Sequence, residues 1–90
     1  MTIRQKNTNP QLGQIFQNKR NELSLKPNSR QHFLNDRVQL NLLTPEDISL
    51  KSLTNIENGK NVPTLKTIKI LASALEVDAI TLLKEILLVI

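Results

Sequence analysis

The chain has 90 residues, a formal net charge of +4, no cysteine and only 2% aromatic residues. Ninety residues make one domain with a modest core, and the lack of cysteine excludes disulfides and thiolate metal sites. The abundance of Leu, Ile, Lys, Asn and Ala predicts an all-α fold with an aliphatic core. The positive charge favours polyanionic partners.

Residues 1–10 are polar and are predicted to be a disordered lead-in to one domain of residues 11–90. The apolar end after Ile80 is interrupted by Lys84 and Glu85 and is too short to span a bilayer. One histidine, no Gly-rich phosphate loop and no paired acids make an enzyme a poor fit, and no cofactor or metal is expected. We expect a cytoplasmic protein without membrane contact.

The first two predicted helices cover residues 11–23 and about 30–41, where apolar side chains recur at helical spacing. Pro27 disfavours helix in the residue before it and so marks the break between them. Ser29 is a good N-cap for the second helix. The apolar residues expected to face the core from these helices are Leu12, Ile15, Phe16, Leu23, Phe33, Leu34, Val38 and Leu40.

The next segment contains Thr44-Pro45-Glu46-Asp47, which combines a cap, a proline suited to the first helical position and acids suited to the positive helix end. It could begin a helix that continues into Ser49, or form an isolated turn. We favour an isolated turn, with the third helix capped by Ser49 and ended by a left-handed Gly59. The buried side of that helix needs only Leu53 and Ile56.

A fourth helix is expected after the cap Thr64, and a fifth begins near Asp78. Their expected core residues are Leu65, Ile68, Leu71, Ala72 and Leu75, followed by Ile80, Leu83, Ile86, Leu87 and Ile90. Asp36 and Arg37 are interpreted as solvated helix charges. The apolar run 86–90 could pack back on the domain, lead into a further domain or form a homodimer contact, and we favour the homodimer.

The second and third predicted helices are separated by a turn, and the third is short and polar on its outside. This is the geometry of a helix-turn-helix, in which the later of the two helices lies in the major groove. Specific motifs surround it: Leu12-Gly13 with Phe16 and Arg20, Ser29 to Leu34, Ser49 to Pro63 with its I-E-N-G exit, and L-A-S-A-L-E-V at 71–77. In combination these motifs resemble the lambda-repressor-like helix-turn-helix domains of the Xre and Cro family, over roughly Leu12 to Leu83. The resemblance implies a five-helix, all-α bundle.

Two departures from the family pattern stand out. The step from Ser29 to Ser49 exceeds the about eleven residues usual between these caps, so either the second helix or the link after it is lengthened. Arg30 stands where Gln is common, and Arg can contact phosphate but cannot brace the third helix in the same way.

The resemblance also implies which residues meet DNA. Lys51 would donate to guanine, Asn55 would pair with adenine and Leu50 would touch a thymine methyl group. Ser52 and Thr54 are expected to make flanking base contacts. The residues expected to contact phosphate are Arg30, Ser49, Asn58, Lys60 and Asn61. Arg20 and Glu57 are implied as a structural ion pair that joins the first helix to the third.

The function that follows from the resemblance is a sequence-specific, DNA-binding transcriptional regulator, a repressor, that binds double-stranded DNA as a homodimer. The alternative is a protein-interaction module on the same fold, such as an antitoxin or anti-regulator, because fold alone does not settle function.

Overall fold

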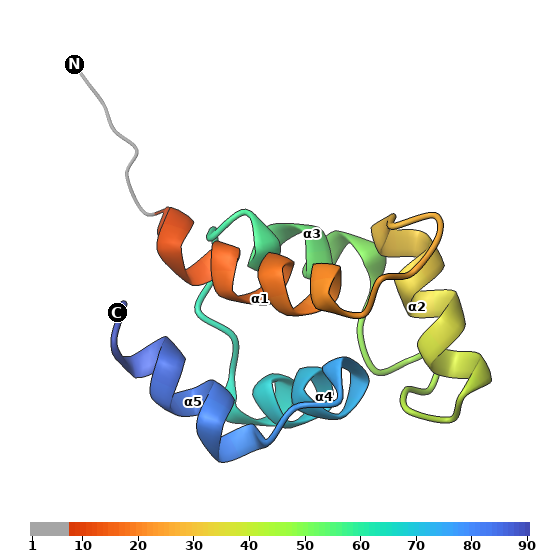
Figure 1. Ribbon diagram of the computed structural model, residues 1–90. Coiled ribbons are helices and arrows are strands. Elements are labelled where there is room, and N and C mark those ends of the chain that lie inside the picture. Colours follow the sequence, from red (N-terminus) through yellow and green to blue (C-terminus); the bar gives the residue numbers. More distant parts are fainter. Residues whose placement is uncertain (1–7) are drawn as a thin grey trace.

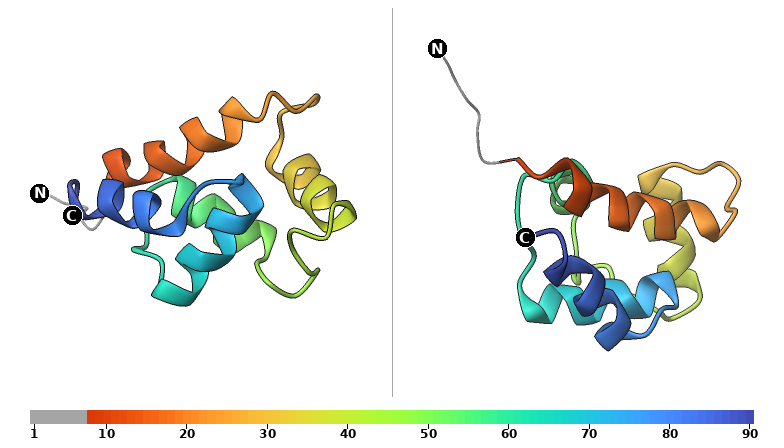
Figure 2. Two further views of the ribbon diagram at one scale, coloured as in Figure 1. Left: turned by 60° about the horizontal axis from the view of Figure 1, so that its bottom comes forward. Right: turned by 60° about the vertical axis from the view of Figure 1, so that its left-hand side comes forward.

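The computed structural model describes residues 8–90, which form five α-helices and no strand, as the sequence predicts. The helices are α1 (Pro10–Glu22), α2 (Arg30–Gln39), α3 (Leu50–Glu57), α4 (Leu65–Leu75) and α5 (Ala79–Leu87). α1 packs on α3 and α4 packs on α5, so the two pairs form two layers, and α2 closes one end (Figure 1). The two further views show the same arrangement (Figure 2).

α1 begins at Pro10, inside the segment that the sequence suggested was a lead-in. Asn9 is its N-cap, because its Oδ1 accepts the Leu12 backbone N–H at 3.1 Å. The backbone N–H of Asn9 donates to the Gly59 carbonyl at 2.7 Å, and its side-chain Nδ2 donates to the Val89 carbonyl at 2.7 Å. Asn9 and Pro10 therefore belong to the folded domain, whereas the rest of the expected lead-in, residues 1–7, lies outside the described residues.

The other four helices begin where the sequence predicts, because each is preceded by a side chain that can accept an otherwise unpaired amide of the first turn. In each case the capping oxygen accepts the backbone N–H three residues further on. The confirmed caps are Ser29, Ser49, Thr64 and Asp78.

The link between α2 and α3 contains the additional residues. α2 was expected to reach about Asn41 but ends at Gln39, because Asn41 adopts a left-handed conformation with φ 62°. The Leu42 N–H then donates back to the Arg37 carbonyl at 2.9 Å. The predicted isolated turn is confirmed at residues 45–47, ahead of the helix that Ser49 caps. The lengthening therefore lies in the link, residues 40–49, and not in the second helix.

The core is aliphatic apart from two phenylalanines and is shared by all five helices. Several residues expected in it are exposed, because Leu40 follows the end of α2 and Leu65 stands at the first position of α4. In α5 the buried residues are Leu82 and Ile86, one turn apart, so the inner face is rotated from the expected one. The remaining corrections are Ile80, Leu87 and Ile90, which are also exposed.

Arg37, which was expected to be solvated, is only 3% exposed. Its Nη1 donates to the Ala74 carbonyl at 3.3 Å and to the Glu76 carboxylate at 2.6 Å, and Nη2 bonds to Asp36. Burial acts to lower the pKa of Arg37, but the hydrogen bonds from Asp36 and Glu76 outweigh it and raise the pKa. Arg37 therefore ties the C-terminal half of α2 to the end of α4.

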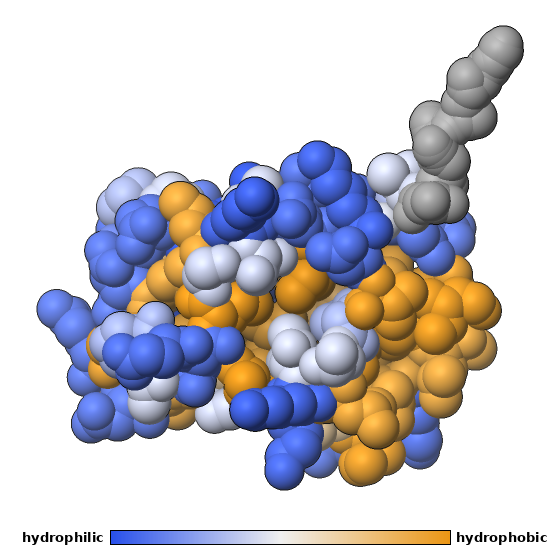
Figure 3. Space-filling view, turned by 180° about the vertical axis from the view of Figure 1, so that it is seen from behind, coloured by the Kyte–Doolittle hydropathy of each residue, from blue (hydrophilic) through white to orange (hydrophobic). Residues whose placement is uncertain are grey.

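The α3–α4 connection runs beside the C-terminal end of α5 (Figures 1 and 2), and both segments carry exposed apolar residues. Figure 3 shows a wide hydrophobic area on this side of the molecule. Leu88 is the most exposed of these residues, at 85%. We call this surface the apolar face, formed by Val62, Leu65, Leu87, Leu88 and Ile90.

Candidate nucleic-acid interface

α3 is an eight-residue helix that buries one side and turns the other to solvent. Leu53, Ile56 and Glu57 are buried, and the positions opposite them are 51, 55 and 58. These three follow the i, i+4, i+7 spacing, so they form one stripe that faces away from the core. Lys51 and Asn58 are exposed and Asn55 is half-buried, which gives the stripe a polar and basic character.

The side chains on and around this stripe differ in whether their hydrogen-bond donors are already used within the protein. The Thr54 hydroxyl donates to the Leu50 carbonyl at 2.8 Å, and Ser49 Oγ donates to Ser52 Oγ at 3.0 Å, so these donors are used within the helix. Within residues 8–90, Lys51 makes no ion pair and the Asn55 side chain makes no hydrogen bond. Lys51 and Asn55 are therefore polar side chains of α3 with unused donors, and the Ser52 hydroxyl, which accepts from Ser49, also keeps its own donor.

The residues expected to contact phosphate lie at the two ends of α3 and at the start of α2. Ser49 is exposed at the beginning of α3, where its Oγ also accepts the Ser52 N–H at 3.0 Å. At the other end, Gly59 has φ 72° and the Lys60 N–H donates to the Asn55 carbonyl at 2.9 Å, which ends the helix. The exposed residues at this end are Asn58, Lys60 and Asn61.

A buried carboxylate joins three helices at the inner end of the site. Arg20 of α1 binds Glu57 of α3 with two hydrogen bonds, from Nε to Oε2 at 2.8 Å and from Nη2 to Oε1 at 2.9 Å. The side chain of Glu57 is 1% exposed. Two bonds in this fork geometry compensate the cost of burying the charge.

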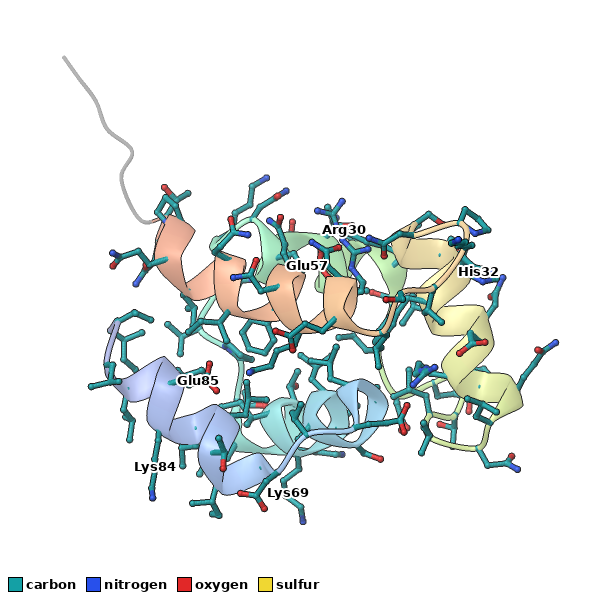
Figure 4. The ribbon with its side chains drawn as sticks, in the orientation of Figure 1. Arg30, His32, Glu57, Lys69, Lys84 and Glu85 are labelled. Carbon is teal, nitrogen blue, oxygen red and sulfur yellow. The ribbon has the colours of Figure 1, made fainter. Side chains whose placement is uncertain are left out.

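Arg30 was expected not to brace the third helix in the way that a glutamine does, and it contacts α3 through the Glu57 carboxylate. Its Nε donates to Glu57 Oε1 at 2.8 Å, so the carboxylate is shared by two guanidinium groups. Figure 4 shows Arg30 and Glu57 together where α2 meets α1 and α3. Sequence reasoning missed this contact because it compared Arg30 with a glutamine of the family and did not consider the Glu57 carboxylate as its partner.

No helix in residues 8–90 is long and apolar enough to cross a membrane. In the same part of the chain, no three His, Asp or Glu side chains come together as they would around a metal ion.

A short helix with a polar outward stripe, held against the core by a buried carboxylate and preceded by a second capped helix, defines a helix-turn-helix domain. Residues 47–82 match the helix-turn-helix family model, which confirms the resemblance to lambda-repressor-like, Xre-type domains over this segment. This segment therefore carries a helix-turn-helix of the kind found in DNA-binding regulators. No significant match was found among curated proteins or solved structures.

The matched segment contains α3, α4 and the first part of α5. It begins at the end of the link and leaves out α2, although α2 is present in the structure. The match begins within the long link at residues 40–49, which separates α2 from α3 by more positions than the family pattern has.

Proposed function

We propose that the protein is a sequence-specific transcriptional repressor that reads the major groove of double-stranded DNA with α3. The observation that supports this most is the outward stripe of Lys51, Asn55 and Asn58, which carries no carboxylate. The single acid of α3, Glu57, is buried beneath Arg20 and Arg30. DNA phosphates would repel an exposed acid at this position, so the charge distribution suits a duplex.

Base contacts are assigned to the side chains on the exposed part of α3. Lys51 donates to the O6 and N7 acceptors of guanine, and Asn55 forms a pair of hydrogen bonds with adenine. Leu50, which is 43% exposed, contacts a thymine methyl group. Ser52 and Thr54 flank these readers. Each good base contact contributes roughly 1–3 kcal/mol of discrimination.

Phosphate contacts are assigned to the ends of α3 and the start of α2, where they would fix the register of the helix on the duplex. Ser49 and the exposed residues 58, 60 and 61 border α3 on both sides. Arg30 lies beside the first amides of α2, which also attract anions. These contacts carry no sequence information of their own and should make binding strongly dependent on salt.

We further propose that the protein acts in the cytoplasm as a homodimer that uses the apolar face. Leu87, Leu88 and Ile90 of this face are exposed at the C-terminal end, beside the α3–α4 connection. Burying them against a second copy would remove apolar surface from water. A two-fold dimer would place two copies of α3 about 34 Å apart on successive turns of the major groove.

A titration of labelled DNA at several salt concentrations tests the proposal. We expect the affinity to fall steeply as salt rises, because several phosphates are contacted. In vitro selection of bound DNA would then supply the preferred operator and its half-site spacing. A negligible, flat response to salt would rule out DNA as the partner and favour the protein-interaction module instead.

Two matched variants test the role of α3. Asn55→Ala should reduce discrimination between the selected operator and unrelated DNA, whereas Lys60→Ala should weaken binding to both about equally. If the two variants lose the same amounts on both DNAs, α3 is not the reading helix.

A further inference from the structure

Arg30 occupies the junction of α2 with the reading helix and is bound there by only one edge of its guanidinium group. We infer that Arg30 is a positioning residue, which sets the orientation of α2 relative to α3 through Glu57 while its outer edge binds a DNA phosphate. This inference rests on the proposed function. It gives one side chain a part in both base discrimination and backbone binding.

The contacts of the guanidinium group support this double role. Nε of Arg30 donates to Glu57 Oε1 at 2.8 Å, whereas its Nη1 and Nη2 have no hydrogen-bond partner within residues 8–90. The side chain of Arg30 is 30% exposed, compared with 9% for Arg20. A guanidinium group is planar and presents five donors, so it can hold a carboxylate on one edge and a phosphate on another.

α2 needs such a tie because α3 is fixed on α1 independently of it. Gln17 of α1 donates to the Glu57 carbonyl at 2.7 Å, and α1 lies close against the end of α3 at Gly13. The link to α3 is hydrogen-bonded to α2 at its start, where the Leu42 and Leu43 N–H groups donate to the Arg37 carbonyl, and an open hollow of about 530 Å³ lies between the rest of the link and α2. At its other end α2 is held to α4 by Arg37. Asn28, just before α2, is held by Arg20, and Arg30 adds a hydrogen bond from the first turn of α2 itself to α3.

The local charge leaves Arg30 able to act on DNA as well. Glu57 carries one negative charge, and Arg20 already binds both of its oxygens, so the junction keeps one surplus positive charge. A cation at the first position of a helix is disfavoured by the helix dipole. The contact with Glu57 offsets that cost, and a phosphate at the first turn of α2 would offset it further.

Three variants separate positioning from simple phosphate binding. Arg30→Lys keeps the charge but lacks the planar fork, so the dependence of affinity on salt should stay as in the wild type. The ratio of its affinity for the operator to its affinity for unrelated DNA should fall roughly tenfold, which is the discrimination that one good base contact provides. Arg30→Gln should show the same tenfold fall in the affinity ratio. The slope of its log affinity against log salt concentration should also be smaller by about one. The control, Lys60→Gln, should reduce the slope by about one and leave the ratio unchanged.

A measurement without DNA completes the test. Residual dipolar couplings of the free, labelled full chain report the orientation of α2 relative to α3, and they should change in both Arg30 variants but not in Lys60→Gln. The inference is overturned if Arg30→Lys keeps both the wild-type affinity ratio and the wild-type couplings. If the wild-type chain shows no salt-dependent DNA binding, the proposed function fails, and unchanged couplings in both Arg30 variants would then overturn the positioning role as well.

Discussion

Gly13 of α1 and Glu57 of α3 approach so closely that a Cβ atom on Gly13 would lie 2.3 Å from the Glu57 carbonyl oxygen. The same Cβ would lie 2.8 Å from the backbone nitrogen of Gly59. Both neighbours are backbone atoms at the end of the reading helix, so they cannot rotate out of the way. Because glycine has no side chain, α1 can pack this closely on α3 at position 13.

Gly13→Ala should destabilise the protein by about 1–3 kcal/mol, since the added methyl group forces the two helix backbones apart. On helix propensity alone the substitution would stabilise α1 by about 1 kcal/mol, so the expected sign is the opposite of the propensity effect. Urea unfolding measures the difference. The matched control is Gln11→Ala at an exposed α1 position, which should stay within about 0.5 kcal/mol. A Gly13→Ala variant as stable as the wild type would show that the cost of moving α1 away from α3 is no larger than the propensity gain of about 1 kcal/mol.

Arg37→Met should cost about 2–4 kcal/mol in unfolding free energy. The substitution keeps an apolar stem of similar length but removes charge-assisted hydrogen bonds and leaves the Ala74 carbonyl without its guanidinium donor. The control is Asp36→Asn, which alters a more exposed partner of the same network and should cost less than about 1 kcal/mol. Equal losses for both variants would mean that the tie between α2 and α4 contributes little.

Asp78 should make the stability of the domain depend on pH in the acid range. Hydrogen bonds from the Thr81 backbone N–H at 2.9 Å and the Thr81 hydroxyl at 3.1 Å lower the pKa of Asp78 below its ordinary value of 3.8. Because the folded-state pKa is the lower one, this contribution is fully present above the unfolded-state pKa and is lost as pH falls through the folded-state pKa.

Asp78→Asn keeps a capping oxygen but cannot titrate. The difference in melting temperature between wild type and variant should therefore be largest near neutral pH and should shrink as the pH is lowered through the range below 3.8. Thermal unfolding followed by circular dichroism across this range gives the difference directly. A difference that does not change with pH would contradict the assignment.

Leu88→Ser should weaken the proposed homodimer, because it removes the most exposed apolar side chain of the apolar face. We expect the dimer dissociation constant to rise roughly ten- to a hundredfold, since each copy would withdraw one leucine from the interface. Sedimentation equilibrium over a range of concentrations measures it. Leu40→Ser, at an exposed leucine beyond the end of α2, is the control and should leave the constant unchanged. A wild-type chain that stays monomeric throughout would rule out the dimer.

The starts of four helices could be predicted from the sequence because the determining interactions are local. Ser29, Ser49, Thr64 and Asp78 each cap an amide only three residues away, so the signal lies within one turn. The buried side of α3 was also predictable, since Leu53 and Ile56 are the apolar residues at helical spacing. Likewise, a short isolated turn ahead of Ser49 follows from its proline and acids.

Two of the errors concern contacts between segments far apart in the chain, and a third concerns the end of α2. Arg37 appeared to be an ordinary surface charge, because its partners Ala74 and Glu76 are brought to it only by the packing of α4. The contact of Arg30 with Glu57 joins α2 to α3 across 27 positions of the chain and has no local signature. Asn41 ends α2 by adopting a left-handed conformation, which asparagine tolerates but which helical periodicity does not reveal.

The base and phosphate contacts remain predictions, but the structure ranks the side chains that would make them. Donor groups at Ser49 and Thr54 are used within the helix, whereas those of Lys51 and Asn55 are not used within the described part of the chain. Sequence spacing alone could not make this distinction, since it depends on the rotamer that each side chain adopts.

The hydrogen bond from Asn9 to the Val89 carbonyl joins residues 80 positions apart and brings the two ends of the folded part together. The same Asn9 backbone also holds Gly59 at the exit of α3. The two ends of the folded part therefore lie close together, and a short peptide could join Asn9 to Ile90. New ends could then be opened in the exposed turn at residues 45–47, which would give a circularly permuted protein whose α1, α3 and α5 keep their present contacts.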